Sequence, residues 1–156
     1  MRHILAIAAL TLMAACGFQP VYSSGATAAS AGNITVAKID GRAGYEMRRA
    51  LLEELAIGLP NVTGPATLEV TLKEKLSRLT FETDGTARRS SVSATGRYVL
   101  IYGDQSISGR QDAELSFAVP DNPYGDVANQ TGASNRVARL LAKKIVDDLR
   151  LQLSAG

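Results

Sequence analysis

The segment Ala66–Leu76, which reads ATLEVTLKEKL, alternates apolar and polar side chains. Leu68, Val70 and Leu72 fall on one side of an extended chain, and the residues between them are polar or charged. A period of two residues is typical of a β-strand that packs one face on a core and leaves the other in water. This strand therefore predicts a sheet that is covered on one side only.

The same alternation continues in two further segments. An Asp84-Gly85 turn, a pair typical of hairpins, leads into residues 90–103. A Gly-Asp pair then leads into residues 107–119, and the apolar side chains of each segment share one parity. We expect the three strands to form an antiparallel meander. The apolar parity changes near the end of the first strand, which predicts a β-bulge near Ser77.

Two segments have apolar residues spaced by four, which places them along one face of a helix. The first, residues 45–60, ends at Gly58 and Pro60, which are typical helix stops. The second lies near the C-terminus, and its pattern starts between Asp126 and Ser134. The two stripes are Met47, Leu51, Leu55 and Leu59, and Val137, Leu141, Ile145 and Leu149.

A further strand is predicted over residues 33–39, so the order of elements is β-α-β-β-β-α. Each element has one apolar face, and two layers are enough to bury all of them. The sequence therefore predicts an α+β fold, a two-layer sandwich in which two helices pack on one face of a four-stranded, mostly antiparallel sheet. Residues 34–156 are expected to form this single domain.

Residues 1–15 have the three zones of a secretory signal peptide. A short basic start precedes an apolar run from Ile4 to Met13, and two alanines follow. The run is about half the ~20 residues that a membrane-spanning helix needs. We therefore expect this segment to direct export and to be removed.

Cys16, the only cysteine, follows that signal directly. Met13-Ala14-Ala15-Cys16 resembles a bacterial lipobox, in which the cysteine is acylated and becomes the new N-terminus. Lipid attachment explains an otherwise lone thiol in an exported protein, and Gly17 after the cysteine favours the outer membrane. Residues 16–33 are rich in Ser, Gly and Ala, so we expect an acylated N-terminus and a flexible tether.

The composition argues against several classes of function. The only histidine, His3, lies in the signal peptide, and the only cysteine is expected to carry lipid. The sequence therefore argues against Ser-His-Asp or Cys-His catalysis and against a His/Cys metal site, and we expect neither a metal nor another cofactor. A net charge of +2 over 156 residues is not typical of a protein that binds nucleic acid.

Three stretches, together with the order of elements, resemble the LptE family of lipopolysaccharide-assembly lipoproteins. They are CGFQPVY at residues 16–22, FAVPDNPY at residues 117–124 and ASNRVARLLAKKIVDDLRLQL at residues 133–153. The resemblance implies a non-enzymatic role as the plug in the lumen of the outer-membrane barrel LptD, on the periplasmic side. It also implies that the pair places lipopolysaccharide in the outer leaflet and that the plug binds lipopolysaccharide directly.

Arginines near the predicted hairpin are the candidates for that binding, because guanidinium groups match the geometry of phosphates. Arg88 and Arg89 form the densest pair, at the tip or shoulder of the turn, and Arg78 and Arg97 are expected on the same strands. The alternative is that Arg88 and Arg89 only solvate a loop.

Two other functions fit the same domain. One is an auxiliary subunit of another envelope transporter, which would share the tether and the small domain. The other is an envelope hydrolase that uses two carboxylates, which would require a cleft with facing acids. The acidic pairs Glu53-Glu54 and Asp147-Asp148 lie four residues from basic partners, which favours solvated ion pairs.

Overall fold

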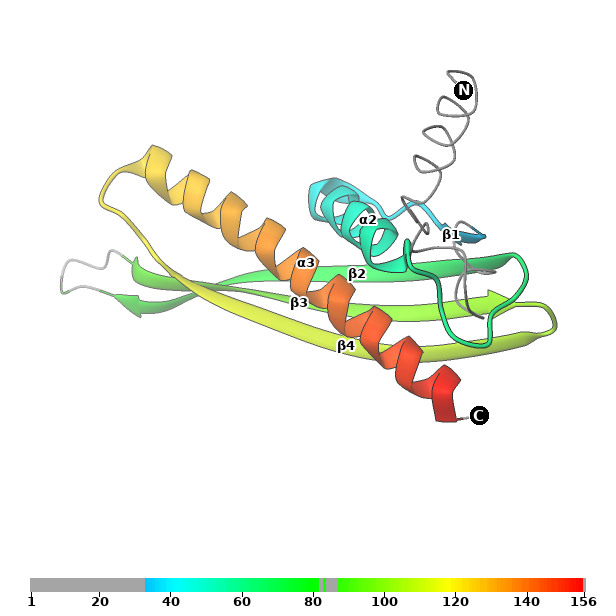
Figure 1. Cartoon of the computed structure of the whole chain (residues 1–156). Coiled ribbons are helices and arrows are strands. Elements are labelled where there is room, and N and C mark those ends of the chain that lie inside the picture. The colour runs from blue at the N-terminus through cyan, green and yellow to red at the C-terminus, as the bar shows by residue number, and fades with distance from the viewer. Residues whose placement is uncertain (1–32, 82, 84–86, 156) are drawn as a thin grey trace, which may run out of the picture.

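The computed structural model describes residues 33–81, 83 and 87–155. The elements run in the predicted order, and both helices cover the same face of the sheet (Figure 1). The α+β two-layer sandwich is therefore confirmed. The elements are β1 (Ile34–Val36), α2 (Gly41–Leu55), β2 (Ala66–Phe81), β3 (Ala87–Tyr102), β4 (Gln105–Ala118) and α3 (Pro123–Ala155).

The four strands lie in the sheet in chain order. β1 pairs in parallel with the first three residues of β2, and β2, β3 and β4 form the predicted antiparallel meander. The predicted bulge is present but lies slightly later than Ser77, since the register between β2 and β3 shifts between Arg78 and Phe81. β1 is also shorter than predicted and ends at Val36.

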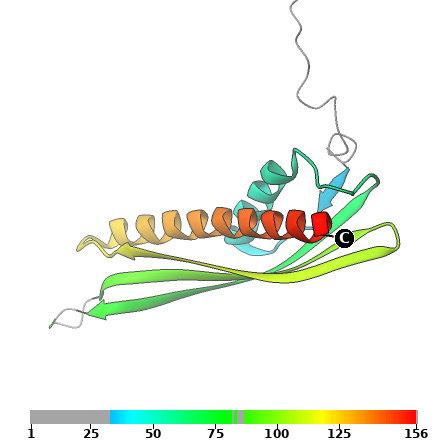
Figure 2. The ribbon, with the colours of Figure 1, turned by 60° about the horizontal axis from the view of Figure 1, so that its bottom comes forward.

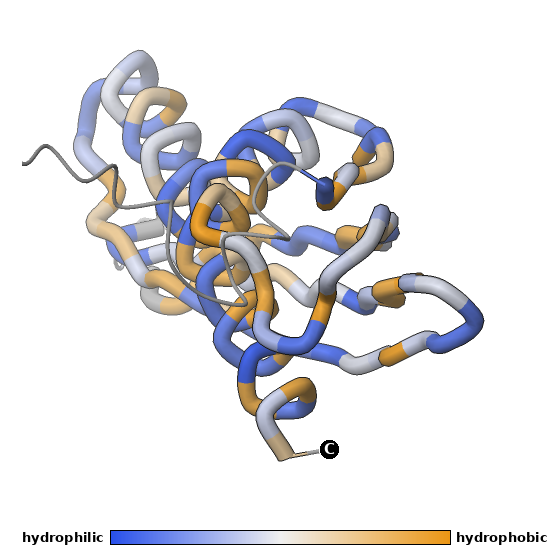
Figure 3. The backbone as a smooth tube through the Cα atoms, turned by 45° about the vertical axis from the view of Figure 1, so that its right-hand side comes forward, coloured by the Kyte–Doolittle hydropathy of each residue, from blue (hydrophilic) through white to orange (hydrophobic). Residues whose placement is uncertain are grey.

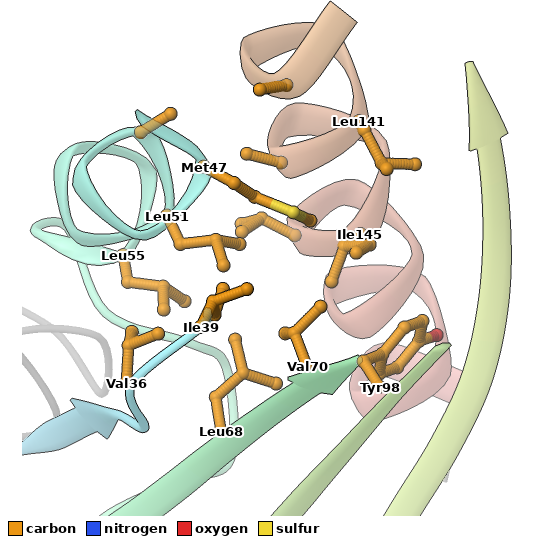
Figure 4. Packing of buried hydrophobic residues seen from close by; sticks show 14 of the residues in the cluster. Val36, Ile39, Met47, Leu51, Leu55, Leu68, Val70, Tyr98, Leu141 and Ile145 are labelled. Carbon is orange, nitrogen blue, oxygen red and sulfur yellow. The ribbon is translucent and has the colours of Figure 1, made fainter. Parts of the chain in front are cut away.

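The core lies between the sheet and the helices, and the predicted stripes point into it (Figure 4). Leu59 is buried as well, although α2 ends at Leu55 rather than near Gly58 as predicted. Met47 and Leu51 of α2 and Leu141 and Ile145 of α3 are fully buried there. On the sheet, Leu68 belongs to the apolar parity that the sequence predicted. The hydropathy of the backbone trace accordingly changes from residue to residue along the strands (Figure 3).

α3 is the longest element, at 33 residues, and it begins before the predicted window. The sequence predicted a start between Asp126 and Ser134, and the observed start at Pro123 lies three residues before that window. Pro123 occupies the first helical position, where a missing N–H costs nothing. The Asn122 side chain accepts a hydrogen bond from the Tyr124 N–H at 2.9 Å and so caps the helix.

Two glycines let α3 approach the sheet closely. A Cβ on Gly96 would lie 2.9 Å from the Ile145 side chain, and a Cβ on Gly109 would lie 2.3 Å from the Tyr98 hydroxyl. Gly96 leaves space for the side chains of α3, and Gly109 leaves space for Tyr98, which lies between the sheet and α3. The helix therefore lies close above β3 and β4 (Figure 2) and crosses the strands obliquely (Figure 1).

The domain has two distinct ends. The described chain enters at Asn33, beside the start of β2 at Ala66. Arg78 lies twelve residues further along β2, which corresponds to about 40 Å of strand. The end formed by the last residues of β2 and the first of β3 is called the distal end below, and α3 also starts there.

Candidate functional site

Arg78 is a cation of the distal end with contacts to two other elements. Its Nη1 donates to Ser90 Oγ at 3.0 Å, on the neighbouring strand, and its Nη2 lies 3.1 Å from Asp126 Oδ2. Nη1 is also 3.4 Å from Asp126 Oδ1, so the guanidinium meets the carboxylate with both of its terminal nitrogens. This fork geometry is the one that arginine uses for carboxylates and phosphates alike.

Local structure explains why Arg78 points toward α3. It pairs with Ser90 in the sheet, and Ser90 has no solvent-exposed surface, which places both residues on the face that the helices cover. Asp126 lies in the first turn of α3, where a carboxylate is favoured by the helix dipole. The ion pair is partly exposed, at 36% for Arg78 and 21% for Asp126, so it contributes at most about 1 kcal/mol to folding.

Arg88 and Arg89 lie within β3, on the shoulder of the hairpin, and both are exposed. Successive side chains of a strand point to opposite faces. Arg88 therefore shares the helix-covered face with Ser90 and Arg78, whereas Arg89 points to the other side of the sheet. The Asp84-Gly85 turn itself lies outside the described residues.

Arg97 does not join this group. It pairs with Thr71 and Arg110 in the middle of the sheet, on the face away from the helices. Eight residues, or about 26 Å, separate it from Arg89 along β3. Of the four predicted arginines, the structure brings Arg78 and Arg88 together on one face, places Arg89 behind them and leaves Arg97 apart.

Asp126 is a functional candidate that the sequence did not reveal. It is 48 residues from Arg78 in the chain, and its own neighbours read as a loop. Only the return of the chain to the distal end along β4, after which α3 begins, brings the two side chains together. No pattern in the sequence could have paired them.

The sheet face away from the helices, called the open face, is polar. Its side chains on β2, β3 and β4 are mainly hydroxyls and charges, and the large exposed apolar side chains of these three strands are Leu79, Val99 and Ile101. Arg110 donates to Asp112 at 3.1 Å, which is the main reason why the pKa of that carboxyl is lowered, and Thr95 lowers the same pKa further. The open face therefore suits a hydrated or polar environment.

A second polar group lies under α3. The Tyr98 hydroxyl donates to Asp148 Oδ2 and accepts from Gln152 Nε2 at 2.9 Å. Burial raises the pKa of Tyr98, and the Asp148 carboxylate raises it further. Tyr98 thus remains a protonated donor at neutral pH and links α3 to the sheet.

Three of the four acids considered as catalytic groups, Glu53, Asp147 and Asp148, are occupied in ion pairs or hydrogen bonds. Asp147 pairs with Lys143 at 3.0 Å and with Arg150 at 3.4 Å, while its neighbour Asp148 binds Tyr98. Glu53 lies 3.8 Å from Arg49. Within residues 33–155, apart from the gaps stated above, no three His, Cys, Asp or Glu side chains are grouped to hold a metal ion.

The described part of the chain has several clefts, and their volumes range from about 190 to about 630 Å³. One of about 190 Å³ lies between α2 and α3, and Arg42, Glu74 and Ser134 are among its lining residues. Ser134 donates to Glu74 at 2.8 Å across it. In the described part of the chain, no helix is both long and apolar enough to cross a membrane. Cys16, the signal peptide and the tether lie outside the described residues.

The comparison with family models gives one match that spans most of the domain. The model described as "LptE: Lipopolysaccharide-assembly" matches residues 29–149, which includes every strand, α2, Arg78, Asp126 and most of α3. No curated protein matches the sequence.

Several solved structures are similar. A candidate lipoprotein from Caulobacter crescentus is 25% identical, with a TM-score of 0.64 over 85% of this chain and 100% of that one. The rare lipoprotein B from Shewanella oneidensis is 12% identical, with a TM-score of 0.60 over 76% and 94% of the two chains. A minor lipoprotein from Acinetobacter baumannii is 11% identical, with a TM-score of 0.55 over 76% and 92%. The last two similarities concern the fold alone.

Proposed function

Because the chain belongs to the LptE lipopolysaccharide-assembly family, we propose that it is the plug of the outer-membrane barrel LptD and that the pair places lipopolysaccharide in the outer leaflet. The role is non-enzymatic: the protein positions a partner and binds an amphiphile. Cys16 carries the lipid that holds the protein to the periplasmic side of the outer membrane. The single observation behind this proposal is the family match over residues 29–149.

The shape and chemistry of the domain support a plug. β2 has 16 residues and is about 50 Å long, which exceeds the apolar band of an outer-membrane barrel, about 25 Å tall. The lumen of such a barrel is polar and hydrated. The open face, with its hydroxyls and charges, matches that environment without burying an apolar surface.

The distal arginines support a lipopolysaccharide site. Lipopolysaccharide presents phosphates and acidic sugars, and arginine is the residue best suited to bind a phosphate through two parallel hydrogen bonds. We propose that Arg78 and Arg88 form this site from the helix-covered face and that Arg89 adds charge from the opposite face. Arg97 lies about 26 Å from Arg89 along β3. It therefore contributes only to the long-range electrostatic potential of the protein and makes no contact with the bound phosphate.

A pull-down tests the partner. The full-length acylated protein, carrying a C-terminal affinity tag, is purified from detergent-solubilised outer membranes, and the bound proteins are identified. Recovery of LptD supports the proposal. Recovery of an inner-membrane transporter without LptD favours the alternative of an auxiliary subunit. A Cys16→Ser variant is the matched control, since it should no longer be labelled by a fatty-acid probe.

A photocrosslinking experiment tests the orientation in the barrel. A crosslinking amino acid at Thr95, on the open face, should capture LptD if this face lines the barrel wall. The same probe at Ala142, which is fully buried under the helix layer, should capture nothing. Equal yields from both positions would contradict the arrangement.

A further inference from the structure

We infer that the cleft between α2 and α3 binds an uncharged sugar ring of lipopolysaccharide and is a second site beside the distal arginines. The inference rests on the proposed binding of lipopolysaccharide and adds a site for its saccharide portion. The cleft has a volume of about 190 Å³, which leaves room for a single monosaccharide ring. Its polar lining residues are Arg42, Glu74, Gln130, Thr131, Ser134 and Asn135.

The charged groups of the cleft keep hydrogen-bonding capacity for a ligand. Arg42 Nη1 donates to Thr131 Oγ1 at 3.3 Å, and Ser134 Oγ donates to Glu74 Oε2 at 2.8 Å. Each of these contacts uses only part of the group, because a guanidinium has further N–H donors and a carboxylate has a second oxygen. Glu74 faces the helices, since it pairs in the sheet with the buried Ala94. The cleft therefore has β2 as its floor and the two helices as its walls.

Two side-chain amides of the cleft have no role in the fold. Within the described part of the chain, Gln130 and Asn135 make no side-chain hydrogen bond. They belong to a stretch of α3, residues 129–135, that reads NQTGASN and is rich in poor helix formers. Gly132 in this stretch is not required by packing, because a Cβ there would meet nothing within 4 Å. Residues that weaken a helix without serving its packing are expected at functional sites.

The chemistry of the cleft favours an uncharged ligand whose groups both donate and accept hydrogen bonds. Glu74 only accepts and Arg42 only donates. A carboxylate or a phosphate cannot donate to Glu74, and an ammonium group cannot accept from Arg42. The hydroxyl groups of a sugar do both, and neighbouring hydroxyls of one ring can bind both ends of a side-chain amide. The two opposite charges also leave the cleft without a net attraction for an ion.

The position of the cleft favours a sugar of the same molecule that the arginines bind. Glu74 and Arg78 lie on the same face of β2, four residues or about 13 Å apart. On α3, Ser134 follows Asp126 by eight residues, or about 12 Å. The two distances agree, and a short oligosaccharide spans them. A phosphate bound at the distal arginines thus leaves the attached sugars within reach of the cleft, which favours a saccharide over a peptide.

A binding experiment with complete and truncated lipopolysaccharide tests the site. The full-length acylated protein in detergent is compared with a Gln130→Ala/Asn135→Ala variant and with Gln105→Ala, an exposed amide at the opposite end of the sheet. The probes are purified lipopolysaccharide and its lipid portion, which keeps phosphates but lacks the core sugars. The double variant should bind the complete probe about tenfold more weakly than wild type, as expected for the loss of two neutral hydrogen bonds. It should bind the lipid portion as wild type does, and Gln105→Ala should match wild type for both probes.

Two further arms identify the interaction and its source. The loss in the double variant should persist as salt rises, because hydrogen bonds between uncharged groups are not screened. A loss that disappears at high salt would assign the effect to charge and overturn the inference. Core oligosaccharide freed from its lipid should compete with lipopolysaccharide for wild type. A glycan fragment of peptidoglycan that competes better would place a different polymer in the cleft and would also overturn the inference.

The outcomes distinguish this inference from the proposed function. If wild type binds neither probe, the proposed function is wrong and the inference with it. If wild type binds both probes equally well, or if the double variant keeps the affinity of wild type, only the inference is wrong. Equal weakening in Gln105→Ala would contradict it too. Should the double variant fold poorly, Ala43→Phe fills the cleft from α2 and should weaken binding of the complete probe alone.

Discussion

The two parts of α3 are attached to the sheet by different chemistry. From Ala133 to Leu153, one side of the helix is buried against β3, β4 and α2, and Leu141, Ile145 and Leu149 have no exposed surface. From residue 123 to 132, the same helix is tied down by ion pairs and hydrogen bonds alone among its described contacts. The packed part is therefore fixed by burial of apolar area, and the distal segment by contacts that water or an anion can replace.

Because of this difference, the packed part of α3 contributes most of the folding stability, whereas the distal segment lies at the candidate binding site. Burial of a leucine stabilises by about 1.5–3 kcal/mol, whereas an exposed ion pair contributes about 0–1 kcal/mol. The stable part lies nearer the end where the chain enters from its N-terminal segment. The weakly held part lies beside the candidate arginines, where a binding site can benefit from local rearrangement.

The largest contrast is expected from truncation of apolar side chains. Leu141→Ala or Ile145→Ala should each lower the free energy of unfolding by about 2–5 kcal/mol, because each removes a fully buried side chain and leaves a cavity. Val127→Ala is the control in the distal segment; its side chain is 64% exposed, and the cost should be within about 0.5 kcal/mol. Denaturant midpoints measure both. Similar losses in the free energy of unfolding for the two parts would contradict the proposed difference between them.

Glycine substitutions should give opposite signs in the two regions. Gly109→Ala places a methyl group against the Tyr98 ring beneath the packed part and should cost about 1–3 kcal/mol. Gly132→Ala meets nothing within 4 Å, and it should stabilise by about 0.5–1 kcal/mol through helix propensity. Thermal unfolding of both variants decides the matter. A loss of stability in Gly132→Ala would mean that the distal segment is more closely packed than its contacts indicate.

Alkaline pH should weaken the packed part specifically. The pKa of Tyr98 is raised above its usual 10.0 by burial and by Asp148, so the folded protein keeps a proton that the unfolded chain loses. The unfolded state then binds fewer protons, and the free energy of unfolding falls by up to about 1.4 kcal/mol per pH unit above pH 10. Tyr98→Phe should remove this part of the pH dependence. A Tyr98→Phe protein with the same alkaline slope as wild type would refute the assignment.

The smallest effect on stability is expected at the arginines. Arg88→Glu combined with Arg89→Glu changes exposed side chains, so stability should move by about 0.5 kcal/mol or less. Lipopolysaccharide binding should weaken strongly at low salt, and the difference from wild type should shrink as salt rises. Lys143→Glu, on the outer side of the packed part, is the control for charge. Equal weakening by both variants would indicate net charge rather than a site.

The fold followed from local patterns. Alternation in β2, β3 and β4 and the spacing of four in both helices depend only on which side chains avoid water, and those faces are the ones buried here. Proline at position 123 misled the prediction of the start of α3, because its effect depends on whether it falls inside a helix or at its first position.

The sequence by itself determined the order of elements, their apolar faces and the arginines available to a phosphate. Only the tertiary structure decided which of these arginines act together. Adjacent Arg88 and Arg89 are separated by the alternation of a strand, and Arg78 meets Asp126 across 48 residues of chain because β4 returns the chain to the distal end, where α3 begins. Burial is a property of each residue and leaves a period in the sequence. A pairing between distant side chains is a property of the fold and leaves none.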